Sequence, residues 1–191
     1  MNVLVACEFS GIVREAFRKR GYNAWSCDLL ESEIPSKYHI RDDVLHHLHD
    51  GWDMMIAHPP CTYLAVSGAR WFKERQSQQV QALDFVSVLM NAPIEKIVVE
   101  NPISVISTKI RKPDQIIHPY QFGHAETKTT CLWLKNLPKL IPTKIIKPLV
   151  SGVHKFAGNN SLHSLDRSRT YPGIADAMAE QWGTLREDIL A

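Results

Sequence analysis

Two segments of the chain place reactive side chains directly after an apolar run and next to proline. Residues 53–57 are followed by His-Pro-Pro-Cys, so that Cys61 comes immediately after two prolines, and residues 96–99 run into Glu100, Asn101 and a further proline. Proline has no N–H for the hydrogen bonds of a central strand, so the chain has to leave the sheet at both points. A thiol on a stiff loop can act as a nucleophile, and a carboxyl group at a strand end can act as a general acid.

The N-terminal part of the chain also brings polar residues to the ends of apolar segments. Residues 2–9 run into Ser10-Gly11 and a helix-like pattern, and Asp28 closes the next strand-like segment. In doubly wound α/β folds, ligands bind beyond the carboxyl ends of the strands. Several strand ends that carry polar chemistry therefore predict an active site along that edge.

Strand-like and helix-like segments alternate at the spacing of a largely parallel α/β sheet. Strands are expected at residues 2–9, 23–30, 53–57 and 97–99, and helices at 12–20, 74–90 and 174–182. A loop is expected at 31–40, a short turn or helix at 43–49, and an antiparallel pairing of 129–134 with 116–122. Residues 137–170 are expected to be mostly irregular, within a single domain that spans residues 1–191.

Five short motifs, in order, resemble those of the cytosine-5 DNA methyltransferases, and in particular short phage and prophage proteins of that kind. The resemblance covers roughly residues 1–135. Phe9-Ser10-Gly11 resembles the opening cofactor motif, Asp28 the ribose-binding acid, Asp43 the adenine-binding aspartate, Pro59-Pro60-Cys61 the nucleophile motif, and Glu100-Asn101 the pair that holds the target base. The resemblance implies a Rossmann-like methyltransferase fold and S-adenosylmethionine as the cofactor.

The resemblance also implies a role for each residue. Carbon C5 of cytosine is a poor nucleophile, and attack of the Cys61 thiolate at C6 makes C5 reactive toward a methyl group. Glu100 is the expected acid near ring nitrogen N3, and Asn101 is its partner at the base. The expected cofactor contacts are Phe9, Ser10, Gly11, Asp28, Asp43 and Pro59.

Four of these residues have a plainer alternative that the sequence leaves open. Cys61 could be a structural cysteine, and Gly11 could simply allow a tight turn. Asp28 could form a cap or a turn, and Asp43 could cap a following helix.

The chain departs from the family at two points. An Arg-x-Arg motif is absent from residues 123–130, where Lys128 or Thr130 is the expected substitute. Only residues 135–170 stand where the family has a target-recognition domain. The sequence therefore predicts DNA binding with weak sequence specificity, or a pyrimidine nucleotide as substrate, with a homodimer as one way to complete the site. A catalytically decayed binding module on the same fold is the non-enzyme alternative.

Composition sets the remaining expectations. The 191 residues are 45% hydrophobic and 22% charged, and no apolar run approaches a membrane span of ~20 residues. The start of the chain reads as a strand rather than a signal peptide. The four cysteines lack a paired spacing, which predicts a reduced, cytoplasmic protein without a metal site.

The net charge is +2, and basic residues concentrate in the second half of the chain. They form either a solvated surface or a face that holds nucleic-acid phosphates. The expected phosphate contacts are Lys144, Lys147, Arg167 and Arg169.

Overall fold

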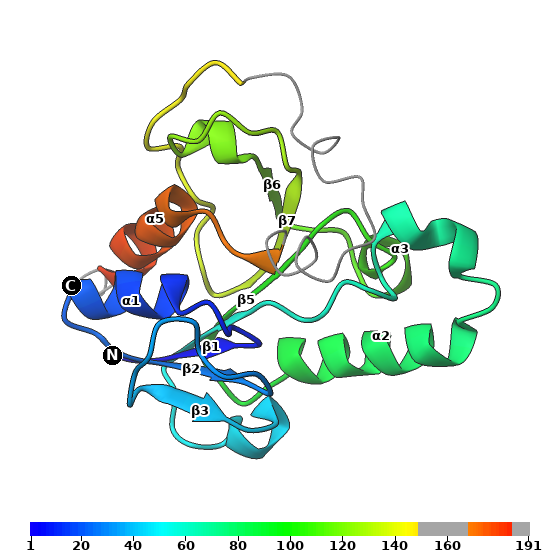
Figure 1. The fold of residues 1–191 in the computed structure, drawn as a ribbon, viewed down its shortest axis with the longest axis horizontal. Helices are drawn as coiled ribbons and strands as arrows, with labels where there is room; N and C mark the ends of the chain where they lie inside the picture. The colour runs from blue at the N-terminus through cyan, green and yellow to red at the C-terminus, as the bar shows by residue number, and fades with distance from the viewer. Residues whose placement is uncertain (149–167, 185–191) are drawn as a thin grey trace.

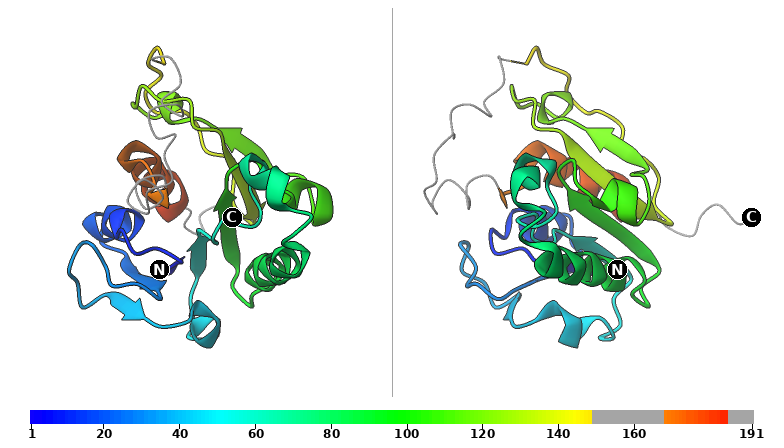
Figure 2. Two further views of the ribbon diagram at one scale, coloured as in Figure 1. Left: turned by 45° about the vertical axis from the view of Figure 1, so that its right-hand side comes forward. Right: turned by 90° about the vertical axis from the view of Figure 1, so that its right-hand side faces the viewer.

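The computed structural model describes residues 1–148 and 168–184, which form a seven-stranded sheet between two layers of helices (Figure 1, Figure 2). The strand order is β3-β2-β1-β4-β5-β7-β6. The strands are β1 (Asn2–Ala6), β2 (Asn23–Asp28), β3 (His39–Arg41), β4 (Met54–Ala57), β5 (Lys96–Asn101), β6 (Gln115–Ile117) and β7 (Thr130–Lys135).

Strands β1 to β5 run parallel, whereas β7 is antiparallel to both of its neighbours, β5 and β6. From β1 the chain moves outward to β2 and β3, and it then returns to the other side of β1 as β4. The point where the strand order reverses, between β1 and β4, is where Rossmann-like sheets bind ligands at the carboxyl ends of their strands. The Rossmann-like α/β fold expected from the sequence is confirmed.

Helices cover both faces of the sheet, as the left view of Figure 2 shows. Helices α1 (Ile12–Lys19) and α5 (Pro172–Gly183) lie on one face, and α2 (Gln76–Met90) and α3 (Ile106–Lys109) lie on the other. Short 3-10 helices connect the larger elements of the described ranges, namely η1 (Val44–His47), η2 (Val66–Trp71) and η3 (Pro119–Gln121). Within the described ranges, no helix is long and apolar enough to cross a membrane.

The central strands are buried on both faces, which explains why they read as continuous apolar runs. Successive side chains of a strand point to opposite faces, so Val5 joins the core under α5 with Met178, while Leu4 joins the core under α2 with Leu89. All four side chains are fully buried. The two cores hold the parallel strands in one register, and that register positions the groups at their carboxyl ends.

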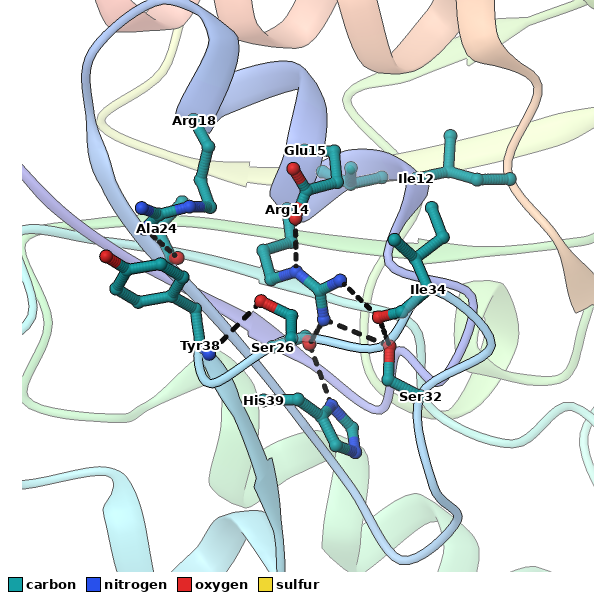
Figure 3. A network of polar contacts seen from close by, with 12 residues as sticks. Ile12, Arg14, Glu15, Arg18, Ala24, Ser26, Ser32, Ile34, Tyr38 and His39 are labelled. Carbon is teal, nitrogen blue, oxygen red and sulfur yellow. Dashed lines mark hydrogen bonds and ion pairs between the residues drawn. The ribbon is translucent and has the colours of Figure 1, made fainter.

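The buried guanidinium of Arg14, in α1, fastens the loop that follows β2 (Figure 3). Nη1 donates to the hydroxyl oxygens of Ser26 (2.8 Å) and Ser32 (3.0 Å), and Nη2 donates to the Ile34 carbonyl (2.9 Å). Nε lies 2.8 Å from a carboxylate oxygen of Glu15. A single side chain therefore connects α1, β2 and the loop beyond Asp28.

The same network explains β3, which forms at the end of the segment expected to be a loop. The His39 ring lies 2.8 Å from Ser26 Oγ and 2.9 Å from the Leu30 carbonyl, and its backbone aligns with Ser26 in the β2–β3 pairing. Because the carbonyl only accepts, Nε2 carries the hydrogen that points to Leu30. Such contacts between residues far apart in sequence leave no trace in local hydrophobic periodicity.

Among the other boundaries, the largest differences from expectation lie in the first strand and in β6. The first strand ends at Ala6 rather than at residue 9, because Cys7 takes a positive φ of 58° and turns the chain. The antiparallel pairing near residue 130 is confirmed, but β6 covers only Gln115–Ile117 because Pro119 begins η3.

We expect Arg14→Met to lower the free energy of unfolding by about 3 kcal/mol, because several buried acceptors lose a charged donor together. The matched control is Arg20→Met, since Arg20 is partly exposed and pairs with Asp176 and Glu180. Exposed ion pairs are worth below about 1 kcal/mol. Urea unfolding followed by circular dichroism measures both changes in the free energy of unfolding. Equal losses in the two variants would contradict the stabilising role of the buried Arg14 network.

Candidate active site

The carboxyl edge of the parallel strands gathers ionisable side chains from four strand ends. Glu8 follows β1, Asp28 ends β2, His58 follows β4, and Glu100 belongs to the end of β5. Burial raises the pKa of Glu8 and that of Asp28, and the nearby imidazole of His58 acts against the rise in both. His58, which follows β4, is therefore close enough to influence carboxyl groups across the β1–β4 switch point.

Glu100 and His58 form a largely buried pair. Their side chains are 13% and 8% exposed, and His58 Nδ1 lies 3.0 Å from Glu100 Oε2. Burial works to raise the pKa of Glu100, but the hydrogen bond from His58 and the positive charge of Lys128 hold that pKa below its ordinary value. Glu100 is consequently an ionised carboxylate at neutral pH.

A second contact between β4 and β5 fixes the turn that carries Cys61. Asn101 is buried, and its Nδ2 donates to the Pro59 carbonyl over 2.8 Å. The Cys61 carbonyl then accepts from the backbone N–H groups of Leu64 (3.0 Å) and Ala65 (2.9 Å). Cys61 itself is exposed and is not part of a disulfide. The turn therefore presents the thiol to solvent, as a nucleophile requires.

Lys128 approaches the site from the segment before β7. Its charge acts on Glu100, and its Nζ lies 6.0 Å from the centre of the Tyr171 ring, at the start of α5. The sequence predicted that Lys128 stands in for an arginine at the base. The structure brings its charge to Glu100; its role at a substrate stays a prediction.

The side chains of Glu8 and Ser10 contact each other and the first backbone N–H groups of α1. Glu8 Oε1 accepts from the N–H of Val13 (2.6 Å) and from the Ser10 hydroxyl (3.2 Å), while Oε2 accepts from the N–H of Arg14 (3.2 Å). Ser10 Oγ in turn accepts from the N–H of Ile12 (3.3 Å). The chain's own side chains thus satisfy the first N–H groups of α1, and a negative charge there is favoured by the helix dipole.

Gly11 is required for two local reasons. Its φ is 74°, in the left-handed region, and a Cβ at this position would lie 2.6 Å from Arg14 Nη2. Phe9 beside it is half-buried. The tight-turn interpretation of Gly11 therefore describes its conformation, while contact of Phe9, Ser10 or Gly11 with a cofactor stays a prediction.

The two aspartates expected at the cofactor both make local backbone contacts. Asp28 Oδ1 accepts from the N–H of Leu30 (2.9 Å), and Asp43 Oδ1 accepts from the N–H of Leu45 (3.0 Å) as the cap of η1. Beside Asp28, the Leu29 side chain is 70% exposed. The turn and cap alternatives are thus present in the structure, and neither prevents a carboxylate from accepting further hydrogen bonds.

The structure describes three of the four basic residues predicted to hold nucleic acid. Lys144 and Lys147 are exposed, and the Lys144 backbone bonds to that of Gln121 and Gly123 near η3. The guanidinium of Arg169 pairs with both carboxylate oxygens of Glu33, at 2.8 and 2.6 Å. Arg167 lies outside the described residues. Among those described, no three His, Cys, Asp or Glu side chains gather as metal ligands.

Sequence reasoning missed Glu8 and His58. His58 stands in the most informative motif of the chain, and its placement directly before Pro59 was a usable signal, because register with β5 sets it beside Glu100. Glu8 had a weaker signal, namely an acidic residue a few positions before a helix start.

Comparisons with known proteins add a distant structural likeness. No family model matches the chain, and no curated protein matches it. Among solved structures, the chain is similar to a prophage-encoded E. coli protein assigned as a DNA modification methyltransferase, with a TM-score of 0.48 and 14% identity. The similarity covers 84% of this chain and 56% of that protein, so the chain spans little over half of its length.

We expect Glu8→Gln to alter the pH dependence of stability in a defined direction. The folded-state pKa of Glu8 lies above the ordinary 4.5. The stability that the Glu8 carboxyl group contributes is therefore fully present below its unfolded-state pKa. That stability is lost as pH rises through its folded-state pKa. Thermal unfolding of both proteins should show the wild type losing stability relative to Glu8→Gln from about pH 4.5 upward.

Asp114→Asn is the control of opposite sign. Burial works to raise the pKa of Asp114, but the hydrogen bond from the Leu134 N–H and the charge of Arg111 hold that pKa below its ordinary value. Wild-type protein should therefore lose stability relative to Asp114→Asn as pH falls. Each wild-type protein is compared with its variant, and the two stability differences should change with pH in opposite directions. A change in the same direction would contradict the buried position of Glu8.

Proposed function

We propose that this chain is an S-adenosylmethionine-dependent methyltransferase that modifies C5 of a pyrimidine, cytosine in DNA, through a covalent bond to Cys61. The observation that carries the proposal is the junction of β4 and β5. There the exposed Cys61 lies on a turn that the hydrogen bond from Asn101 to the Pro59 carbonyl fixes. The Glu100 carboxylate at the same junction is hydrogen-bonded to His58. These groups lie at the sheet edge where Rossmann-like folds bind ligands.

Cys61 supplies the nucleophile in this proposal. Its thiolate bonds to C6 of the ring, which moves electron density to C5 and makes that carbon able to accept a methyl group. After the transfer, C5 loses its proton to a base and the electrons return to expel the Cys61 sulfur. The exposed turn gives the ring access, and the prolines limit motion of the backbone that carries the thiol.

Glu100 holds the ring in this proposal. A cytosine attacked at C6 gathers negative charge on the side of N3. A proton that N3 takes from solvent offsets this charge, and the resulting N3–H donates a hydrogen bond to the Glu100 carboxylate. Lys128 adds a positive charge near the same carboxylate. Because lysine lacks the two-pronged geometry of arginine, Lys128 acts here as a point charge rather than as a bidentate clamp.

The residues at the ends of β1 and β2 fit the cofactor by chemistry. S-adenosylmethionine, when bound, supplies an electrophilic methyl group on a positively charged sulfur. Asp28 would accept the ribose hydroxyls, as an acid at the end of a second strand does in dinucleotide-binding folds. The exposed Leu29 offers an apolar face to adenine, and Asp43 is the expected partner of its amino group. Glu8 adds a further carboxyl group that suits the cationic part of the cofactor.

DNA is the polymer that the resemblance implies, and exposed Lys144 and Lys147 supply positive charge for its phosphates. Arg169 contributes less, because Glu33 compensates its charge. Arg167 remains part of the proposed set on the sequence alone. Only residues 135–170 stand in place of a target-recognition domain, which supports binding with weak sequence preference.

One observation favours the alternative of a binding module without methyl transfer. Glu8 and Ser10 accept hydrogen bonds from the first N–H groups of α1, so these N–H groups already have acceptors and do not need the carboxylate of a cofactor. Binding of S-adenosylmethionine separates the two functions, since the module requires none.

We expect Cys61→Ser to abolish methyl transfer while the protein stays folded, because a serine hydroxyl is far less acidic than a thiol. The control is Thr62→Ala, an exposed neighbour on the same turn. Transfer of tritiated methyl groups to DNA measures the activity, and circular dichroism measures the fold. Wild-type activity in the serine variant would remove Cys61 as the nucleophile.

We expect Asp28→Asn to weaken binding of S-adenosylmethionine by about 1–3 kcal/mol, the range of hydrogen bonds to a charged group. Asparagine keeps an oxygen that accepts from the Leu30 N–H, so the turn is preserved. Calorimetry compares this variant with Asp84→Asn, whose side chain is exposed on α2. Equal affinities would place the ribose elsewhere.

We expect duplex DNA to bind with log K falling by about 0.9 per phosphate contact for each unit of log salt concentration. The double variant Lys144→Ala/Lys147→Ala should bind more weakly and with a shallower salt slope than Lys19→Ala, which changes an exposed lysine of α1. Fluorescence anisotropy measures both. Affinity that does not depend on salt, or a strong preference for one short sequence, would contradict a phosphate-dominated surface.

A further inference from the structure

His58 has features that the proposed chemistry leaves unexplained. Its side chain is 8% exposed, and its backbone N–H donates to the Ala6 carbonyl over 2.9 Å, which extends the β1–β4 pairing. Nδ1 contacts Glu100, whereas Nε2 is buried without a hydrogen-bond partner among the described residues. An imidazole with a buried, unpaired nitrogen is poorly suited to a purely structural role.

The hydrogen bond fixes which atoms carry hydrogen. An ionised carboxylate only accepts hydrogen bonds, so His58 Nδ1 is the donor and Glu100 Oε2 the acceptor. Glu100 Oε1 makes no further hydrogen bond within the described residues. The oxygen that remains for a ligand is therefore an acceptor, and it favours a donor opposite it.

Ionisable groups from the neighbouring strand ends surround this pair. The charge of His58 acts on the carboxyl groups of Glu100 from β5, of Glu8 after β1 and of Asp28 at the end of β2. The cation Lys128 acts on Glu100 from the side of β7. Surrounded in this way, His58 keeps its Nδ1 hydrogen toward Glu100, and Glu100 has two positive or donating partners that favour its ionised form.

We propose that His58 is a positioning residue that holds Glu100 as a hydrogen-bond acceptor, so that the site binds a pyrimidine ring with a hydrogen at N3 and takes up a proton when that ring is cytosine. This inference rests on the proposed pyrimidine site. A uracil-type ring carries that hydrogen in its neutral form and binds without a change in protonation. A neutral cytosine presents a lone pair at N3 and binds only after N3 has gained a proton.

The proton has a defined origin and fate. It is taken from solvent when cytosine binds, it forms the N3–H that donates to Glu100 Oε1, and it returns to solvent when the neutral ring leaves. The protonated ring is also the form that a thiolate attacks more readily at C6, because N3 already carries the positive charge that offsets the incoming electrons. His58 thus links base binding to activation without itself touching the base.

The test uses single-stranded oligodeoxyadenylate that contains one central dC or one central dU, with the whole chain and S-adenosylhomocysteine present. Calorimetry in two buffers of different ionisation enthalpy counts the protons taken up on binding. The expected result is uptake of about one proton with the dC strand and about none with the dU strand, so that only dC affinity falls about tenfold per pH unit near neutrality.

Two variants separate the role of His58 from general disruption. His58→Asn places an amide N–H near the position of Nδ1 and should keep the difference between the strands. His58→Leu removes the donor, so that buried Glu100 becomes protonated, donates to the neutral cytosine N3 and loses the proton uptake.

Equal proton uptake for the two strands in the wild type would overturn the role of His58 even if His58→Leu failed to fold. Unchanged uptake in a folded His58→Leu protein would overturn it as well. Binding of neither strand would remove the pyrimidine site and the proposed function together, which distinguishes that failure from the other two.

Discussion

The parallel pairing of β4 with β5 is the constraint on which the candidate site depends. Ala57 is aligned with Val99 in that pairing, so the next two positions set His58 beside Glu100 and Pro59 beside Asn101. Both pairs are joined by side-chain hydrogen bonds just where the strands end. A shift of one residue would move the carboxylate of Glu100 to the opposite face of the sheet and away from His58.

The charged groups around this junction are buried only because each has a partner. Glu8 closes the N-terminus of α1, Arg14 extends from the same helix to the loop beyond Asp28, and His58 pairs with Glu100. An unpaired charge in such positions would be strongly destabilising. The arrangement makes α1 and its preceding turn a rigid boundary of the site, and it leaves the turn at Cys61 as the exposed part.

Much of this arrangement could be predicted from the sequence, and the exceptions share one physical cause. Apolar runs that end at prolines located the ends of β4 and β5 and put Cys61 on an exposed turn. Hydrogen bonds between distant residues have no such local pattern. The contacts of Ser26 with His39, and of Glu8 with the first turn of α1, were therefore not foreseen.

The candidate site shows the same division between local and distant information. The types and positions of Cys61 and Glu100 followed from the sequence, whereas the partner that sets the state of Glu100 did not. His58 is 42 residues away from Glu100 along the chain, and only strand register brings the two together. Likewise, the sequence placed Arg169 on a phosphate-binding face, while its ion pair with Glu33 emerges only in three dimensions.

Covalent trapping tests the central claim most directly. A DNA strand that contains 5-fluorocytosine has no C5 proton to lose, so the bond between the ring and the enzyme persists after methyl transfer. Mass spectrometry of peptides from the wild-type protein, incubated with this DNA and S-adenosylmethionine, identifies the bonded residue. The account predicts a methylated adduct on Cys61 that depends on the cofactor. An adduct on another residue, or none with DNA bound, would contradict it.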